Sequence, residues 1–242
     1  MELKGKTVII TGSTGRLARH ITIALAQAGC DCLCHYHKNS SEAQQLVTQI
    51  KSLGQKAIAV QADLMKPAEI EKLFAEAGQL SCPQILINST AIFEREPLEN
   101  ITFENAQKTF DLNLTAAIMM CKYFAKQVSN MPIAKIINIV DAGAIKPWGQ
   151  YVLYCSSRAG LIGATKAMAK ELAPGICVNA VAPGIISTSD DDFDDDEKKR
   201  QLAFIPAGRF GKTDEVAHAV KFLLESDYVT GQIISVDGGR TI

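Results

Sequence analysis

A tyrosine and an arginine one helical turn apart could serve proton transfer, and a helix-surface tyrosine without that role is the alternative. Tyr154 precedes Arg158 by four positions in a stretch, 151–172, whose pattern predicts a helix, so the two side chains share one helix face. A tyrosine becomes a useful proton donor when a nearby cation lowers its pKa from the ordinary value of about 10. The fixed charge of Arg158 is therefore expected to favour the Tyr154 phenolate. Tyr151 offers no such pair, because the fourth residue after it is Cys155.

An acidic residue, Asp141, lies 13 positions before Tyr154 and directly follows an apolar run at 136–140. An ionised carboxylate only accepts hydrogen bonds, so it suits the N–H groups of a nitrogen heterocycle; when protonated it can also donate one. A β-ketoacyl thioester presents a carbonyl oxygen instead, which prefers a hydroxyl donor. Asp141 therefore favours a heterocyclic substrate, and capping of a loop is its alternative role.

A turn of glycine and small residues at 11–18 separates the first apolar run from the first amphipathic stretch. Backbone N–H groups in such a turn, together with the dipole of the helix that follows, hold a phosphate. The alternative is a turn with no ligand. The residues predicted to contact a cofactor here are Gly12, Ser13, Arg16 and Leu17.

The second apolar run ends at residues 35–39 without the acidic residue that NAD-specific sites carry at this position. Basic side chains replace it, and together with Arg16 they could bind the 2′-phosphate of NADPH, which favours NADPH over NADH. A metal site at His35 and His37 and a solvated basic turn are the alternatives. The predicted cofactor contacts in this part of the chain are Tyr36, His37, Lys38, Asn39, and, after the third run, Asp63 and Leu64.

Composition excludes several other classes of protein. The chain has 242 residues, of which 47% are hydrophobic, and a formal net charge of −1, so neither global disorder nor nucleic-acid binding is expected. No run approaches the ~18 apolar residues of a membrane span, and the run behind the polar N-terminus is too short for a signal peptide. Alternating Cys30, Cys32 and Cys34 fit one face of a strand better than a zinc site, so we expect reduced core thiols, no metal and a cytoplasmic location.

Short apolar runs alternate with longer amphipathic stretches along the whole chain, which predicts a parallel sheet covered by helices on both faces. The expected fold class is α/β, a single-domain Rossmann-type doubly wound parallel sheet of about seven strands over residues 1–242. Ligands of such sheets bind beyond the C-terminal ends of the strands. The strands are expected at 7–10, 32–35, 57–60, 85–87, 136–140, 177–181 and 233–236, and the helices at 17–28, 40–53, 67–77, 103–128 with a break near Asn113, 151–172 and 213–224.

The motifs in this order resemble the short-chain dehydrogenase/reductase family nearly end to end. The matching segments are Thr11-Gly12, Ala62-Asp63-Leu64, Asn88, Asn113, Tyr154, Pro183-Gly184 and Val236-Asp237-Gly238-Gly239. The resemblance implies an NADPH-dependent hydride-transfer reductase with catalytic positions at Tyr154, Arg158, Asp141 and Asn113. It also implies cofactor contacts at Asn88, Ala91, Tyr154, Arg158, Pro183, Gly184 and Thr188.

The details are most similar to the pteridine reductase branch of that family. The branch carries Arg within the glycine turn, as at Arg16, and Asp where other members use Ser, as at Asp141. An aromatic residue, here Phe93, stacks on the pterin in that branch; packing in the core is the alternative. The substrate contacts implied are therefore Phe93, Asp141 and Tyr154, and the implied reaction is reduction of a pteridine or a similar small planar substrate.

Arg158 departs from the family pattern, which has Lys at this position. Arg keeps the positive charge but cannot serve as a proton relay that needs a deprotonated state. A carbonyl reductase, such as a 3-oxoacyl-thioester reductase, stays open as an alternative. A second alternative is a catalytically weak NADPH-binding sensor or scaffold.

An acidic stretch at 190–197, followed by three basic residues, has the charge order of a helix start and is expected to form part of a substrate lid around 187–210. Its charge counts against an acyl carrier protein as partner. By resemblance the chain forms a homotetramer or homodimer, and small residues such as Gly160 and Gly163 could serve that contact or internal packing. Its expected partner is a small-molecule substrate, with no nucleic acid and no membrane.

Overall fold

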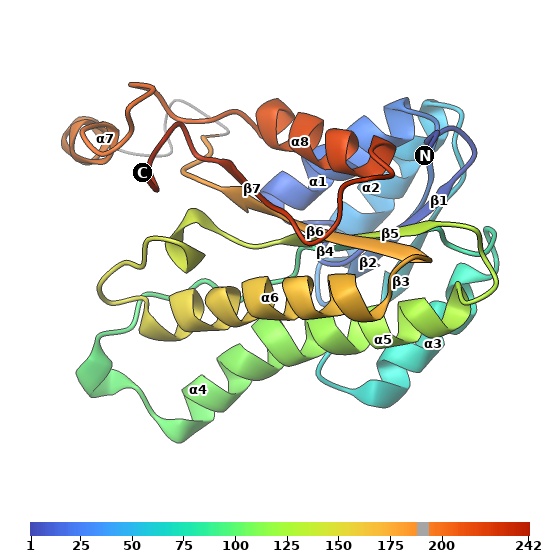
Figure 1. Ribbon diagram of the computed structural model, residues 1–242, viewed down its shortest axis with the longest axis horizontal. Coiled ribbons are helices and arrows are strands. Elements are labelled where there is room, and N and C mark those ends of the chain that lie inside the picture. The colour runs from blue at the N-terminus through green and yellow to red at the C-terminus, as the bar shows by residue number, and fades with distance from the viewer. Residues whose placement is uncertain (188–193) are drawn as a thin grey trace.

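The computed structural model describes residues 1–187 and 194–242 (Figure 1). Its elements follow the predicted alternation of strand and helix. In chain order they are β1 (Thr7–Ile10), α1 (Arg16–Gln27), β2 (Asp31–Tyr36), α2 (Ser40–Ser52), β3 (Ala57–Gln61), α3 (Pro67–Ala77), β4 (Ile85–Asn88), η1 (Leu98–Asn100), α4 (Phe103–Phe110), η2 (Asp111–Thr115), α5 (Ala116–Gln127), β5 (Ala134–Ile139), η3 (Ala142–Ala144), α6 (Val152–Glu171), β6 (Ile176–Pro183), α7 (Asp195–Leu202), α8 (Thr213–Glu225) and β7 (Ile233–Val236).

All strands of the described residues form one seven-stranded parallel sheet in the order β3-β2-β1-β4-β5-β6-β7. The chain starts at β1, builds outward to β3, then crosses over to β4 beside β1 and continues to the opposite edge. This reversal leaves a crevice beyond the C-terminal ends of the central strands, where doubly wound sheets bind ligands. The predicted fold class is confirmed.

Two hydrophobic layers cover the two faces of the sheet. Side chains alternate along each strand, so in β1 Val8 and Ile10 pack with α1, α2 and α8, whereas Ile9 packs with α3, α5 and α6. Figure 1 shows the same division, with α1, α2 and α8 on one side of the sheet and α3 to α6 on the other. Because both faces are covered, the strands can be apolar throughout, which is why their runs were recognisable in the sequence.

Cys32 and Cys34 lie on one face of β2, as predicted, and Cys30 directly precedes the strand. Cys30, Cys32 and Cys34 are fully buried in the layer formed with α1 and α2, while Leu33 faces the opposite layer. All seven cysteines are free thiols in the structure. Burial raises the pKa of Cys30 and of Cys34 to about 12, which keeps these thiols protonated and unreactive.

The long helical region predicted at 103–128 breaks at the expected place. One π-helical turn, η2, separates α4 from α5 and has Asn113 at its centre. Asn113 is buried, and its amide oxygen accepts from the backbone N–H of Ile92 at 2.7 Å while its amide nitrogen donates to the Ile92 carbonyl at 2.9 Å. The widened turn therefore fixes the segment after β4, which borders the site.

The described part of the predicted lid contains a short helix, α7. Asp194 caps it by accepting from the backbone N–H of Glu197 at 2.8 Å, and three acidic residues occupy its first turn. The helix start inferred from the charge order is thus confirmed at this end, because anions stabilise the positive end of the helix dipole. The rest of the acidic stretch lies outside the described residues.

Candidate active site

The main cavity lies beyond the C-terminal ends of β1, β4, β5 and β6 and has a volume of about 760 Å³. One wall, here called the cofactor wall, is lined by small and aliphatic residues together with Arg16; the other, here called the substrate wall, is lined by aromatic, acidic, amide and arginine side chains. The cofactor wall is formed by Gly12, Gly15, Arg16, Leu17, Ala18, Ser89, Ala91, Ile139, Val140, Pro183, Gly184, Ile185 and Ile186. The substrate wall is formed by Phe93, Asp141, Trp148, Tyr151, Tyr154, Arg158, Glu197, Gln201, Phe204 and Arg240.

The glycine turn closes the cofactor wall and has the features of a phosphate site. Gly12 has φ +63, and a Cβ there would lie 3.0 Å from Thr90 Oγ1 and 3.2 Å from Thr90 Cα, so only glycine fits. Helix α1 begins at Arg16 without a side-chain cap from any residue that the structure describes, and without an acid in its first turn. The N–H groups of Gly12, Ser13 and Gly15 are bonded within the chain, so a phosphate would be held by the N-terminus of α1, whose residues Leu17 and Ala18 line the cavity.

Two further observations fit a dinucleotide along this wall. A Cβ on Gly184 would lie 2.7 Å from Asp237 Cα, so the chain at the end of β6 must stay without a side chain. The buried hydroxyl of Thr90 has no hydrogen-bond partner among the described residues and lies beside the glycine turn. Thr90 itself does not line the cavity, so the close approach at Gly184 is the observation compatible with a nucleotide lying along this wall.

His35 supports the glycine turn from behind. Its side chain is 1% exposed; Nδ1 accepts from the backbone N–H of Gly12 at 3.0 Å, and Nε2 lies 3.0 Å from the carbonyl oxygen of Ala62. The first bond requires an unprotonated Nδ1, so Nε2 carries the proton and donates it to Ala62. Burial lowers the pKa of His35 to about 4. With both ring nitrogens engaged, the alternatives of a metal pair and a solvated turn are wrong for His35.

The other predicted cofactor residues fall into two groups. His37, Lys38 and Asn39 are exposed and Tyr36 is half-buried at the end of β2, outside the main cavity. Asp63, Leu64, Ser13 and Asn88 also lie outside it. Asn88 is buried, and its amide donates to Asn138 Oδ1 at 2.9 Å. Predicted contacts of these residues with a cofactor stay predictions, as does that of Thr188, which lies outside the described residues.

Tyr154 and Asp141, two residues of the substrate wall, are joined by a hydrogen bond. The Tyr154 hydroxyl donates to Asp141 Oδ2 at 2.9 Å, and Asp141 Oδ1 accepts from the backbone N–H of Gly143 at 2.7 Å. Asp141 thus caps the short turn η3, which was the alternative role considered for it, and also binds the tyrosine; its contact with a substrate stays a prediction. The spacing of 13 residues brings together the end of β5 and the first turn of α6.

The pKa of Tyr154 is raised, which corrects the expectation of a lowered one. Burial is the largest cause, the negative charge of Asp141 adds to it, and the positive charge of Arg158 opposes both. The sequence identified the cation but not the burial and the carboxylate that outweigh it. Burial also raises the pKa of Asp141. The hydrogen bonds from the Gly143 backbone N–H and the Tyr154 hydroxyl lower it, but by less. The pair therefore retains the tyrosine proton at neutral pH.

Arg158 is 3% exposed and lies behind Tyr154. Its Nη2 donates to the carbonyl oxygen of Thr90 at 3.1 Å, and its guanidinium carbon lies 5.7 Å from the centre of the Tyr154 ring. Nη1 lies 3.4 Å from the Asn113 carbonyl oxygen, so the two family positions are in contact. Its Nε has no partner in the described part of the chain. Arg158 therefore places one positive charge beside Tyr154 and one unused donor in the site.

Aromatic rings line the mouth of the substrate wall. Phe93 is 56% exposed, so the core-packing alternative is wrong for it. Its ring stacks on Tyr151 with centres 5.0 Å apart and meets the edge of Tyr154 at 4.7 Å, and Trp148 lies at 6.4 Å. This arrangement offers a flat apolar surface next to the Tyr154 hydroxyl, suited to a planar molecule.

Several residues of the substrate wall were missed in the sequence. Trp148 and Tyr151 lie in the loop before α6, Glu197 and Gln201 on α7, and Arg240 after β7. None of them belongs to a motif with a fixed spacing, because they meet only where distant segments fold over the sheet. Two signals existed in the sequence: Glu197 and Gln201 lie in the lid predicted around 187–210, and Arg240 directly follows the two glycines of the family ending.

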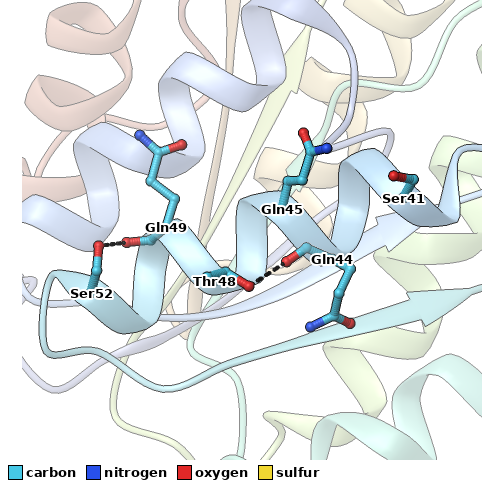
Figure 2. A pocket seen from close by; sticks show the side chains of 6 residues that line it. All are labelled: Ser41, Gln44, Gln45, Thr48, Gln49 and Ser52. Atoms are coloured by element: carbon cyan, nitrogen blue, oxygen red, sulfur yellow. Dashed lines mark hydrogen bonds between the residues drawn. The ribbon is translucent and has the colours of Figure 1, made fainter.

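A second hollow, of about 620 Å³, lies along the exposed face of α2 (Figure 2). The Thr48 and Ser52 hydroxyls donate to the backbone carbonyls of Gln44 and Gln49 within the helix. No ionisable group lines it, so it offers no site for chemistry. Its lining residues are Ser41, Gln44, Gln45, Thr48, Gln49 and Ser52.

Comparison with known proteins establishes the family. A family model described as Enoyl-(Acyl carrier protein) reductase matches residues 13–241. The chain is 35% identical over 246 residues to the 3-oxoacyl-[acyl-carrier-protein] reductase of a Synechocystis strain, covering 99% of this chain and 98% of that protein. The chain belongs to the short-chain dehydrogenase/reductase family. It is therefore an oxidoreductase, and the family resemblance seen in the motifs is confirmed.

Two solved structures of short-chain dehydrogenase/reductase relatives superpose over the whole chain. One is a blue fluorescent protein from a metagenomic library in complex with NADPH, with TM-score 0.91, 30% identity and full coverage of both chains. The other is FolM alternative dihydrofolate reductase 1 from Brucella canis complexed with NADP, with TM-score 0.90 and 25% identity, covering 100% of this chain and 96% of that one. The similarity to the family is spread over several activities, so it does not single out the pteridine branch.

Two negative findings apply to residues 1–187 and 194–242. They contain no group of three or more His, Cys, Asp or Glu side chains arranged to hold a metal ion. Among the helices in those ranges, none is both long enough and apolar enough to span a membrane.

Proposed function

We propose that this chain is an NADPH-dependent reductase of a pteridine or a similar planar nitrogen heterocycle. The observation that carries the proposal is the Tyr154–Asp141 hydrogen bond beneath an aromatic surface. A carboxylate at this point accepts from ring N–H and amino groups, and Phe93 provides a face for stacking. NADPH- and NADP-bound relatives of the same fold support the cofactor.

The cofactor wall would hold NADPH, with the start of α1 as the part that suits its phosphates. When bound, NADPH supplies the hydride that reduces a C=N bond of the ring. Tyr154 is protonated at neutral pH and donates its proton to the ring nitrogen, directly or through water; burial and Asp141 oppose this transfer by raising its pKa, and the positive charge of Arg158 assists it. Asp141 orients the ring, and the charge of Arg158 stabilises the phenolate left behind.

The test is NADPH oxidation with 7,8-dihydrobiopterin beside an acetoacetyl thioester, for the wild type and for Asp141→Ser. We expect preferential turnover of the pterin by the wild type. Replacing the carboxylate by a hydroxyl should lower kcat/KM for the pterin by about 10- to 100-fold and raise it for the thioester, because a hydroxyl can donate to a carbonyl oxygen. Wild-type preference for the thioester would contradict the pteridine proposal.

The second candidate is a 3-oxoacyl-thioester reductase, favoured by the Synechocystis relative and by the description of the matching family model. The acidic first turn of α7, next to the cavity, weakens this candidate because an acyl carrier protein is itself acidic.

A catalytically weak NADPH-binding protein is tested with the same assays. That role requires tight NADPH binding, no wild-type turnover with either substrate, and activity restored by Arg158→Lys. Turnover by the wild type with either substrate would exclude it.

We also propose a cytoplasmic homotetramer or homodimer. Seven free thiols are typical of a reducing compartment. Gly160 is used for internal packing, since a Cβ there would lie 2.9 Å from Leu114 Cδ2, whereas a Cβ on Gly163 meets no atom within 4 Å. Gel filtration that gave a monomer would contradict the assembly.

A further inference from the structure

The substrate wall contains a second arginine, Arg240, that the proposed reaction does not use. A tight turn after β7 delivers it to the cavity: Gly238 and Gly239 have φ +63 and +87. The Asp237 carboxylate accepts from the backbone N–H groups of Gly239 at 3.0 Å and Thr241 at 2.9 Å. Two left-handed glycines and a carboxylate that ties the turn together fix the direction in which Arg240 leaves the backbone.

The Arg240 guanidinium is held on two sides. Its Nη2 donates to Gln201 Oε1 of α7 at 3.1 Å, and its central carbon lies 5.8 Å from the centre of the Trp148 ring. Its Nη1 is buried and has no hydrogen-bond partner among the residues that the structure describes. Leaving a charged donor buried and unpaired is unfavourable, so this N–H group points to an acceptor that a ligand supplies.

Arg240 and Asp141 act on one another electrostatically within the same cavity. The positive charge of Arg240 is among the influences that lower the pKa of Asp141, against the larger effect of burial. Asp141 and Arg240 therefore offer a ligand in this cavity an acceptor and a donor, respectively. A ligand that satisfies both must carry N–H donors at one edge and an oxygen acceptor elsewhere.

We infer that Arg240 binds the substrate by donating a hydrogen bond from Nη1 to an oxygen acceptor, either a ring carbonyl or a carboxylate. The inference deepens the proposed function, because it concerns the same reductase site. Stacking on Trp148 and the bond to Gln201 hold the planar guanidinium in one orientation. Arg240 thereby selects substrates that carry an oxygen acceptor in addition to the ring edge that Asp141 binds.

The test compares the wild type with Arg240→Gln, Arg240→Lys and the control Arg200→Gln. Arg200 lies on the exposed side of α7 and does not line the cavity, so its variant removes the same charge nearby. The ligands are 7,8-dihydrobiopterin, which has a ring carbonyl and no carboxylate, 7,8-dihydrofolate, which has both, and an acetoacetyl thioester. Besides KM and kcat, the quenching of Trp148, the single tryptophan of the chain, measures binding to the NADP⁺-loaded protein without turnover.

For Arg240→Gln we expect KM and the quenching Kd to rise about 10- to 100-fold, with kcat changed less than about threefold and NADPH affinity unchanged. Arg240→Lys should recover part of the affinity, and Arg200→Gln should behave as wild type. An equal rise for both pteridines assigns the acceptor to the ring carbonyl; a rise for dihydrofolate alone assigns it to a carboxylate.

Unchanged KM and Kd in Arg240→Gln would overturn the inference and leave Arg240 a structural link to α7. An equal loss of substrate affinity in Arg200→Gln would overturn it as well, and so would a loss of NADPH affinity in Arg240→Gln. The absence of wild-type Trp148 quenching by all three ligands would also overturn it. Binding and turnover of the thioester alone would refute the pteridine proposal, while the Arg240 variants would still be tested on the thioester carbonyl.

Discussion

The two walls of the cavity differ in what they are made of. The cofactor wall presents small and aliphatic residues together with Arg16, and its shape depends on positions such as Gly12 and Gly184 where any side chain would collide. The substrate wall presents Asp141, Tyr154, Arg240 and aromatic rings, whose side-chain chemistry decides what binds. Changes on the first wall should act on cofactor affinity, and changes on the second on turnover and substrate choice.

The largest expected effect is the loss of turnover when the proton donor on the substrate wall is removed. Tyr154→Phe deletes the hydroxyl that bonds Asp141 and leaves the ring in place, so kcat should fall by about 10²- to 10⁴-fold. NADPH affinity should change less than about threefold, measured by fluorescence titration.

Tyr123→Phe is the matched control for the tyrosine change. Its hydroxyl bonds Glu71 on the exposed surface, so its removal should leave kcat at the wild-type value. A Tyr154→Phe protein that kept wild-type kcat would remove this residue from the mechanism.

A substitution on the cofactor wall should instead weaken the binding of NADPH. Gly12→Ala places a Cβ 3.0 Å from Thr90 Oγ1 at a φ of +63, so the turn must shift. The NADPH Kd should rise by about tenfold or more, since such strain costs about 1–3 kcal/mol. Gly163→Ala, in α6 with no atom within 4 Å of its new Cβ, should leave the Kd unchanged. Equal Kd values for both variants would show that the turn does not hold the cofactor.

The smallest expected effect concerns the residue behind the glycine turn. His35 has a pKa of about 4 in the folded chain and about 6.5 when unfolded, so at pH values between these the unfolded chain binds a proton that the folded chain does not. Stability should therefore fall as pH falls from about 6.5 to 4, by about 2 kcal/mol between pH 7.5 and 5.0 in urea unfolding. His35→Gln should lose this dependence, even if it is less stable at every pH; an unchanged pH dependence would rule out His35 as its source.

The fold was predictable because each strand is buried on both faces and appears as a short apolar run between amphipathic helices. Even the break in the long helix was visible at Asn113. The resemblance to the family paired Asp141 with Tyr154 through their spacing of 13 positions, and the structure joins the two side chains by a hydrogen bond.

The electrostatic balance of the site was not predictable in the same way. The sequence shows Arg158 one turn from Tyr154, but not that burial and Asp141 together raise the tyrosine pKa. Arg240 and Gln201 meet only because α7 folds back against the segment after β7 (Figure 1), a contact without a fixed spacing in the chain. Contacts that depend on the path of a loop leave little trace in the sequence.

The burial of the cysteines gives the folded chain an uneven chemical reactivity. Six of the seven thiols are buried, and Cys82 is the partly exposed one. A thiol reagent would therefore modify the native protein at one rapidly accessible position and the unfolded chain at seven. The number of labels on each molecule would then distinguish folded from unfolded copies without any knowledge of the substrate.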